Sequence, residues 1–449
     1  MSTIVLPSAP SLATRLAGTG MLYARWLTAE VGARRGGALP LRRRGGSRSL
    51  LLLASSFPPD VTGGVYRPLS FVQHAVERGW RVTVLTRPVG GVVSAAGRHL
   101  EQQLPEGVSV IRVPLPLLPL SWKLAPQVDG FFDHALAVFE TAARRLERPD
   151  LVLCTGPAFD MFIAGELITR RFHTQLVLDY RDEWNECPFH FVGKGRSGRL
   201  WERRCLARAA AVLFTTRSQL SHALSCFQEL DETRGFVVPN GWEPGDTEPG
   251  AAAPAVTDVS GKFWLSFLGA LSFWTLPGPF LNALAAAVKR YPALAEQLRL
   301  RFIGKKTPRA LMQLDAFPHQ QMLQLIEHVP RSQVPALIAG SGALLLPIDS
   351  RYERYLPGKL FDYLASDRPI LVFGGRGEAG ALVERLGAGV VVPEADGERL
   401  AQALLAIMHG DAKRWCGDVR REWAQEHTRR RSAEQALTVL DSVIGRTVE

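Results

Sequence analysis

The segment YLPGKLFDYLASDRPIL, residues 355–371, carries side chains that could bind a phosphate group. Pro357 and Gly358 can open a helix, whose first N–H groups are then free to meet an anion. Lys359 and Asp362 follow on one face of this helix, three residues apart. The lysine can neutralise phosphate charge, and the carboxylate can accept hydrogen bonds from ribose hydroxyls. A surface ion pair between these two side chains is the structural alternative.

The segment DYRDEW, residues 179–184, places three carboxylates and an arginine at the end of an apolar run. Asp182 and Glu183 are the candidates for orienting an acceptor or taking its proton. An ion pair with Arg181, without any catalytic role, is the alternative.

Two glycine-containing stretches also follow apolar runs. Gly63 and Gly64 lack a Cβ, so the backbone there can approach a ligand closely. Gly304 precedes Lys305 and Lys306, and Lys305 could reach a ligand from this position. A turn in the first stretch, and a solvated turn in the second, are the alternatives.

The run from Gly375 to Gly380 matches the G-x-G-x-x-G pattern, and Glu394 and Asp396 follow it about 20 residues later, as in a nicotinamide-binding site. Such sites usually occupy a first βαβ unit, whereas this run lies late in the chain. A dehydrogenase is therefore kept only as an alternative.

Short apolar runs alternate with amphipathic stretches from residue 50 onward, which is typical of βαβ units and parallel sheets. A stretch rich in Pro, Gly and Ala, residues 239–261, interrupts this rhythm and indicates a linker. The sequence predicts two doubly wound α/β domains, with a ligand bound at the carboxyl ends of their strands. The expected strands are 50–55, 81–86, 108–113, 151–154, 175–179, 211–214 and 235–238 before the linker, and 263–268, 298–303, 325–329, 343–347, 369–373 and 389–392 after it.

The composition is that of a folded protein that does not cross a membrane. Hydrophobic residues make up 46% and charged residues 21% of 449 residues, and no apolar run reaches the roughly 18 residues that a membrane-spanning helix needs. The five cysteines are scattered and odd in number, which argues against a disulfide framework or a zinc site and favours a reducing compartment.

Most of the formal charge of +10 lies at the N-terminus, because residues 1–49 hold eight arginines against the single Glu30, a balance of +7. The remainder lacks the clustered basic surface of a nucleic-acid-binding protein. Three interpretations of this tail stay open: a transit peptide, an interfacial helix, or a disordered or misassigned leader with translation starting at Met21, which we favour. The apolar positions at helical spacing are Leu12, Leu16, Tyr23 and Leu27, and the residues that interrupt this face are Gly18, Gly20 and Glu30.

The segment at 355–371, together with the later stretch GEAGALVERLGAGVVVPEADGERL, resembles the donor-binding half of the retaining glycosyltransferases of family four. The opening LLLASSFPPDVTGGVYRPLSFVQHAVERGWRVTVLT, the segment VLDYRDEWNECPF and the strand exit VVPNGWEP are similar to further parts of the same family. The resemblance runs in order over roughly residues 50–410.

This resemblance implies the GT-B fold, two Rossmann-like doubly wound domains facing a central cleft. It divides the chain into a basic N-terminal extension (1–48), an acceptor-side domain (49–238), a linker (239–261), a nucleotide-sugar-binding domain (262–425) and a C-terminal helix (426–449). It also places Val329 and Arg331 beside the nucleobase, where a strand-to-helix turn capped by Ser332 is the alternative. The implied donor-binding residues are Gly304, Lys305, Val329, Arg331, Gly358, Lys359 and Asp362, and those of the acceptor and diphosphate loop are Gly63, Gly64 and Arg67.

The chain departs from the family pattern at two places. Arg354 stands where the family usually has the first of two glutamates, and FLGALSFWTLPG lacks the usual arginine and lysine. Lys359, with Lys305 or Lys306, is the substitute cation. No D-x-D occurs, so we expect neither a metal on the nucleotide nor any other cofactor.

The function expected from the resemblance is retaining transfer of a sugar from a nucleotide-diphosphate sugar to a glycan or lipid-linked acceptor, in the synthesis of cell-surface polysaccharide or glycoconjugate. The alternatives are a sugar-nucleotide epimerase or hydrolase on the same fold and a catalytically weak binding subunit. We expect a cytoplasmic enzyme, with docking on the inner face of an anionic cytoplasmic membrane as an open option. The apolar loop at 114–126 could contact lipid or lie under the following helix.

Overall fold

The computed structural model describes residues 11–34, 47–115, 132–188, 195–244, 261–272, 275–327, 329–394, 396–410 and 412–445. It divides into two compact units. Unit 1 consists of Met1–Thr215, Gln219–Val238 and Ala433–Glu449, and unit 2 of Thr216–Ser218 and Pro239–Ser432. Most of the expected linker and of the loop at 114–126 falls outside the described residues.

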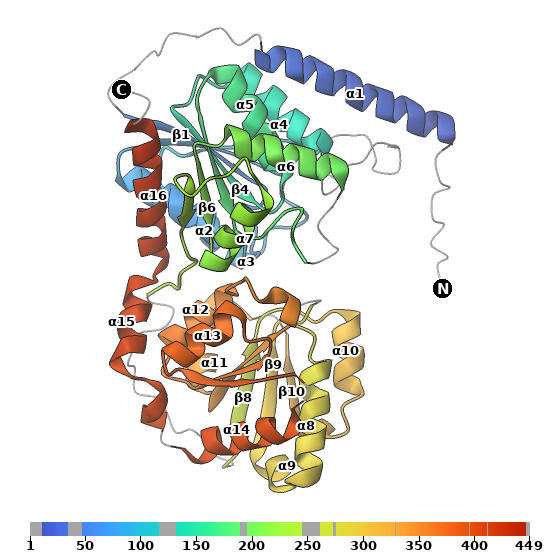
Figure 1. Ribbon diagram of the computed structural model, residues 1–449, viewed down its shortest axis with the longest axis vertical. Coiled ribbons are helices and arrows are strands. Elements are labelled where there is room, and N and C mark those ends of the chain that lie inside the picture. The colour runs from blue at the N-terminus through green and yellow to red at the C-terminus, as the bar shows by residue number, and fades with distance from the viewer. Residues whose placement is uncertain are drawn as a thin grey trace. The chain divides into compact units, whose positions relative to one another are not determined.

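Unit 1 is built on a seven-stranded parallel sheet in the order β3-β2-β1-β4-β5-β6-β7 (Figure 1). Its strand order reverses between β1 and β4, the place where ligands bind in such sheets. Long apolar runs explain why the central strands are buried on both faces. The strands are β1 (Ser49–Ala54), β2 (Arg81–Thr86), β3 (Ser109–Arg112), β4 (Leu151–Gly156), β5 (Gln175–Tyr180), β6 (Ala211–Phe214) and β7 (Gly235–Val237).

Helices cover both faces of this sheet. Phe71 of α2 and Leu437 of α16 pack into one hydrophobic cluster with alternate residues of β1, β2 and β4. On the opposite face, Gly165 of α5 lies so close to Cys154 of β4 that a Cβ would come 2.2 Å from its Sγ. The helices are α2 (Tyr66–Glu77), α3 (Ala95–Gln102), α4 (Phe132–Arg145), α5 (Asp160–Phe172), α6 (Arg196–Arg208), α7 (Arg217–Cys226) and α16 (Arg429–Gly445).

An additional helix, α1 (Leu12–Arg34), lies along α4 and α5 of unit 1 (Figure 1). Glu30 faces inward and accepts hydrogen bonds or ion pairs at 2.8 Å from Arg170 and Arg204. Trp26 packs edge-on against Trp201. The interpretation of the tail as a disordered leader is therefore wrong for residues 12–34, where Gly18 and Glu30, two of the residues that interrupt the apolar face, are buried and only Gly20 is exposed.

Unit 2 is built on a six-stranded parallel sheet in the order β10-β9-β8-β11-β12-β13. This strand order reverses between β8 and β11. The strands are β8 (Phe263–Leu268), β9 (Leu298–Ile303), β10 (Leu323–Ile326), β11 (Ala343–Ile348), β12 (Ile370–Gly374) and β13 (Gly389–Val392).

The two faces of this second sheet bury separate clusters. Helices α8, α10 and α14 pack on one face, around Phe280 and Phe302. Helices α11, α12 and α13 pack on the other, around Leu346 and Leu360. The helices are α8 (Gly278–Arg290), α9 (Ala293–Gln297), α10 (Pro308–Asp315), α11 (Val334–Ala339), α12 (Gly358–Ala365), α13 (Gly377–Arg385), α14 (Gly397–His409) and α15 (Asp418–Glu426).

Two parallel sheets with helices on both faces confirm the predicted α/β class. The thirteen strands of the described residues coincide with the expected ones to within two residues at their ends, except that β10 ends three residues before the expected strand at 325–329. No helix among the described residues is both long and apolar enough to span a bilayer.

Candidate functional site

Helix α12 of unit 2 begins where the sequence predicted an anion-binding helix start. Pro357 precedes the helix in an extended conformation, with φ −57° and ψ 135°, and no side chain caps its N-terminus. Gly358, its first residue, is exposed, and a Cβ there would meet no atom within 4 Å. The first N–H groups of α12 are thus free of side-chain acceptors, which is the arrangement that favours phosphate.

Lys359 brings a cation to this helix start. Its Nζ lies 3.8 Å from the centre of the Phe267 ring at the end of β8. Burial lowers the pKa of Lys359 to about 7. Among the described residues no hydrogen bond or ion pair to Lys359 is present, so the alternative of an ion pair with Asp362 is not what the structure shows; Asp362 pairs with Arg331 instead. An anionic ligand would restore the ordinary pKa of the amine by pairing with it.

Gly269 makes room for this lysine at the exit of β8. Its φ is +133°, and a Cβ on it would lie 2.6 Å from Lys359 Nζ. Gly304, at the exit of β9, has φ +123°, and a Cβ on it would lie 2.4 Å from the Gly269 carbonyl oxygen. Gly304 therefore supports the site by letting the two strand exits approach each other.

The two lysines after Gly304 lie in different environments. Lys306 is turned inward, with its side chain 2% exposed, and its Nζ donates at 2.7 Å to the carbonyls of Gly304 and Ile326. Its burial lowers its pKa. Lys305 is exposed and is the one of the pair that solvent or a ligand can reach.

Arg331 and Asp362, both predicted to bind the nucleoside, form an ion pair with each other. Arg331 donates from Nη1 to Asp362 Oδ2 at 2.9 Å and from Nη2 to Asp362 Oδ1 at 2.5 Å. This bidentate pair fixes both groups on the side of α12 that also carries Lys359. Val329 packs partly buried against the hydrophobic cluster beneath α12.

Arg420 of α15 anchors the far end of α12, and the sequence analysis did not identify it. Its buried guanidinium donates to the carbonyls of Tyr363 and Leu364 in the last turn, at 2.7 and 3.0 Å. It also bonds the carbonyls of Arg368 and Trp415. Burial lowers the pKa of Arg420 to about 10. A cation at this end satisfies carbonyls that the helix leaves open.

In unit 1, Arg181 connects the loops at the carboxyl edge of the sheet. It donates from Nη1 to the Gly64 carbonyl and from Nη2 to the Pro157 carbonyl, both at 2.7 Å, and from Nε to the Gly156 carbonyl at 3.0 Å. A Cβ on Gly64 would lie 2.6 Å from Arg181 Nη1, so this glycine makes room for the guanidinium. Gly63 is exposed and meets no atom within 4 Å of a Cβ position.

Arg67, predicted to lie in the ligand loop, is buried. Its Nη2 lies 2.8 Å from Asp179 Oδ1, and the same nitrogen donates to the Val238 carbonyl. Thr155 Oγ1 donates to the other oxygen of Asp179 at 2.8 Å. The charge of Arg67 is thus balanced inside the unit, where it joins α2 to the ends of β5 and β7.

The two candidate catalytic carboxylates, although adjacent in the chain, lie in different environments. Glu183 is buried and accepts a hydrogen bond at 2.8 Å from His222 Nδ1. Asp182 is half-buried, and no described residue forms a hydrogen bond or ion pair with it. Burial raises the pKa of Asp182, and the nearby charge of Arg181 partly opposes this. Of the two, Asp182 is the carboxylate that could accept a proton from a ligand.

The sequence matches two family models. Residues 62–241 match the glycosyl transferase 4-like domain, and residues 264–410 match the glycosyl transferases group 1. Together these stretches cover well over half of the chain. None of the curated proteins matches the sequence.

Several solved structures share the fold of the whole chain at low sequence identity. Sucrose-phosphate synthase from Thermosynechococcus elongatus matches with a TM-score of 0.68 and 15% identity, over 89% of this chain and 100% of that one. HepE from Anabaena, in complex with UDP and glucose, matches with a TM-score of 0.64 and 15% identity, over 88% and 100%. WaaG, a glycosyltransferase involved in lipopolysaccharide biosynthesis, matches with a TM-score of 0.61 and 15% identity, over 87% and 99%.

These matches decide between the enzyme classes that the motifs left open. The G-x-G-x-x-G run only connects β12 to α13, and neither family model is that of a dehydrogenase. The chain folds into two Rossmann-like units, and the second carries Lys359 at the uncapped start of α12. Both family models match in chain order, so the chain belongs to the group 1 glycosyltransferases of GT-B fold.

Proposed function

We propose that this glycosyltransferase moves a sugar from a nucleoside diphosphate sugar to a glycan or lipid-linked acceptor with retention of configuration. The product would serve cell-surface polysaccharide or glycoconjugate synthesis. The neighbour HepE is solved with UDP-glucose, and WaaG is involved in lipopolysaccharide biosynthesis, which supports this donor and acceptor class.

The observation that carries the proposal is Lys359 at the uncapped start of α12. A half-buried amine next to free helix N–H groups, without an acidic partner among the described residues, is complementary to a diphosphate. The Arg331–Asp362 pair beside it offers hydrogen-bonding groups for the nucleoside. We therefore assign the donor to unit 2 and no metal to the nucleotide.

In the proposed reaction, the bond between the anomeric carbon and the β-phosphate oxygen breaks as the acceptor oxygen forms its bond to the same carbon. The acceptor proton passes to the departing phosphate. Lys359 and the helix start stabilise the negative charge that develops on the diphosphate. Asp182, in unit 1, orients the acceptor hydroxyl.

Calorimetry on the Lys359→Ala variant tests the phosphate role. The variant should lose about 1.5 to 3 kcal/mol of binding to the nucleoside diphosphate, and much less to the matching nucleoside, because the lost contact is charge-assisted. Lys289→Ala, at an exposed lysine on α8, is the matched control and should bind both ligands as wild type does. Equal losses for both ligands in Lys359→Ala would contradict the assignment.

Incubation with a panel of sugar nucleotides, followed by mass spectrometry, separates the alternatives. Product formed only when an acceptor is present supports the transferase. Donor turnover without an acceptor would indicate an epimerase or hydrolase. Donor binding without turnover against any acceptor would indicate a binding subunit.

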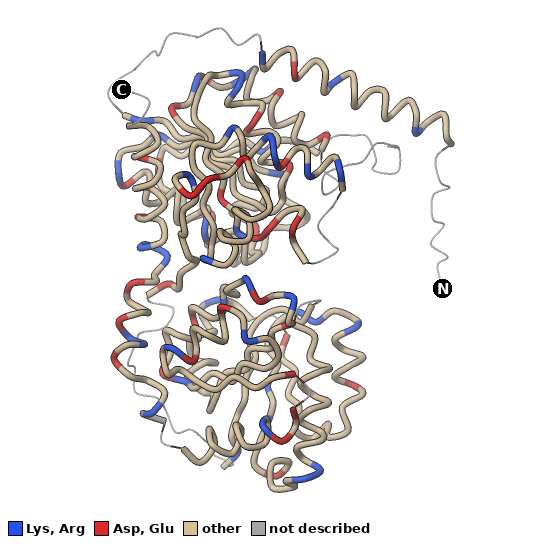
Figure 2. The backbone as a smooth tube through the Cα atoms, viewed as in Figure 1, with Lys and Arg blue, Asp and Glu red and all other residues tan. Residues whose placement is uncertain are grey.

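We further propose that this enzyme is cytoplasmic and that α1 docks it on an anionic lipid surface. The helix carries a row of large apolar side chains that point away from unit 1, each between 45% and 66% exposed: Leu12, Leu16, Met21, Tyr23, Leu27 and Val31. Figure 2 shows that charged residues are sparse along this helix. A helix of this kind lies in the membrane interface with its apolar face in the headgroup region. The excess of arginine over residues 1–49 is complementary to anionic headgroups.

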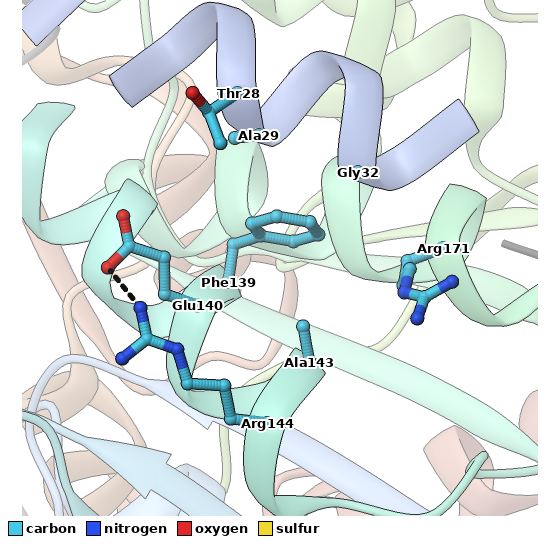
Figure 3. Close-up of a pocket in the computed structure, with 8 residues that line it drawn as sticks. All are labelled: Thr28, Ala29, Gly32, Phe139, Glu140, Ala143, Arg144 and Arg171. Carbon is cyan, nitrogen blue, oxygen red and sulfur yellow. Dashed lines mark ion pairs between the residues drawn. The ribbon is translucent and has the colours of Figure 1, made fainter. Parts of the chain in front are cut away.

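A groove next to α1 extends the basic character of this surface. It has a volume of about 380 Å³ and is floored by Phe139 and Ala143 of α4. Figure 3 shows Arg144 and Arg171 on opposite sides of Phe139, with Arg144 paired to Glu140. Two arginines beside an apolar floor suit a phosphate-bearing lipid headgroup and the start of its acyl chain.

Sedimentation with phosphatidylglycerol and phosphatidylcholine vesicles tests the docking. The full chain should sediment with the anionic vesicles only, and less so at high salt, since surface charges are screened. The double variant Leu16→Glu, Leu27→Glu should stay in solution, whereas Met312→Glu, at a side chain 72% exposed in unit 2, should sediment as wild type does. Equal sedimentation of all three proteins would refute the docking.

A further inference from the structure

Helix α7 of unit 1 holds a histidine and a cysteine one turn apart. His222 Nε2 lies 3.6 Å from Cys226 Sγ. Cys226 forms no disulfide and is partly accessible. Zn–S bonds of about 2.3 Å and Zn–N bonds of about 2.0 to 2.1 Å at a tetrahedral angle place these two atoms about 3.5 Å apart. The observed separation fits this value.

A third ligand comes from the loop after β5. A carboxylate oxygen of Glu186, His222 Nε2 and Cys226 Sγ all lie within 4.8 Å of one another. Glu186 also forms an ion pair at 2.8 Å between its Oε1 and Arg199 Nη1. A carboxylate has two oxygens, so it can bind a metal while it keeps an arginine partner.

Glu183 orients the imidazole toward these ligands. Its Oε1 lies 2.8 Å from His222 Nδ1, and its side chain is 7% exposed. A carboxylate can only accept, so the proton resides on Nδ1 and the lone pair of Nε2 points toward Cys226. A buried carboxylate on the second nitrogen of a histidine is the usual support of a metal-ligating imidazole.

We propose that Glu186, His222 and Cys226 bind a zinc ion, with water in the fourth position and Glu183 as the positioning residue. Thiolate, imidazole and carboxylate together suit Zn²⁺ and not Mg²⁺ or Ca²⁺, which take oxygen ligands. On binding, the Cys226 thiol releases its proton to solvent, and the metal takes its place on sulfur. The ion fastens α7 to the loop that follows β5, which also carries Asp182.

This inference runs against the expectation drawn from cysteine spacing, which argued against a zinc site. No C-x-x-C pair exists, and the zinc ligands come together only through folding, from two different segments of the chain. The zinc site is independent of donor binding, which is assigned to unit 2, and its metal content can be measured without any sugar transfer.

The test is metal analysis of the full chain, purified, stripped with a chelator and reloaded. Wild type should bind equimolar Zn²⁺, and Co²⁺ in its place should give a thiolate charge-transfer band and intense visible bands of a four-coordinate ion. Cys226→Ser should lose the charge-transfer band, and His222→Ala should lose stoichiometric binding. Cys416→Ser, at the other partly accessible cysteine, is the matched control and should behave as wild type.

Glu183→Gln separates positioning from packing. The glutamine keeps the shape, and we expect zinc affinity to fall about 10- to 100-fold, with the cobalt spectrum retained at saturation. Circular dichroism checks that each variant is folded, and Glu186→Gln, at a partly exposed ligand, serves if a substitution on α7 prevents folding. Absence of equimolar zinc in wild type, or an unchanged charge-transfer band in Cys226→Ser, overturns the proposal.

Discussion

The pKa of Lys359 makes donor binding depend on pH. In the free protein burial lowers this pKa to about 7, whereas the diphosphate contact needs the charged amine. The charged fraction is therefore about 0.9 at about pH 6 and about 0.1 at about pH 8, and the apparent affinity scales with this fraction. We expect binding of a nucleoside diphosphate sugar to weaken about tenfold between these two pH values.

The sign of this effect follows from the proton balance. The bound state holds a proton on Lys359 that the free protein has largely lost at about pH 8, so binding there takes up almost one proton per ligand. Calorimetry in buffers of different ionisation enthalpy measures this uptake directly. A sugar nucleotide is the proper ligand, since the terminal phosphate of a free nucleoside diphosphate titrates on its own near about pH 6.

Two variants decide whether Lys359 is the group responsible. Lys359→Arg carries a permanent charge and should bind with little dependence on pH. Lys289→Ala should keep the wild-type dependence. An affinity that is flat from about pH 6 to about pH 8 in wild type, or an unchanged slope in Lys359→Arg, would refute the reasoning.

Three further predictions concern residues outside the phosphate contact. Asp182→Asn should lose turnover while donor affinity and melting temperature stay near wild type, as kinetics and calorimetry can check; normal turnover would exclude a catalytic role for this carboxylate. Glu30→Gln should destabilise unit 1 by about 1 to 3 kcal/mol in urea unfolding, because Arg170 and Arg204 each lose one of their two carboxylate partners and keep only Glu166; unchanged stability would show that α1 contributes little to the fold. Arg420→Lys should lower the melting temperature of unit 2, since one ammonium cannot reach the four carbonyls that the guanidinium bonds; an unchanged melting temperature would contradict the anchoring role.

The sheets could be predicted from the sequence because parallel strands that are buried on both faces consist of nearly continuous apolar residues. Runs such as 50–54 and 343–348 are too short for a typical helix, and a strand that is covered on both faces buries all of their side chains. Helix α1 could not be predicted in the same way. Its inward face contains Gly18 and Glu30, and only the fold supplies the arginines that neutralise Glu30 there.

The candidate site was predictable in residue types but not in partners. Lys359 and Gly358 follow from helix-start chemistry, which is local. The pairing of Asp362 with Arg331, and of Glu183 with His222, depends on segments that meet only after folding. Asp362 and Glu183, which were expected to face a ligand, are therefore paired with other side chains of the protein.

The junction made by Arg181 depends on backbone and not on side chains. The guanidinium bonds the carbonyl groups of Gly64, Gly156 and Pro157, and every amino acid carries such a group. The loops at this edge of unit 1 can consequently exchange other side chains without losing their attachment, provided that residues 64 and 156 stay glycines. Such a junction lets a protein vary the surface that chooses its substrate while the scaffold beneath it stays the same.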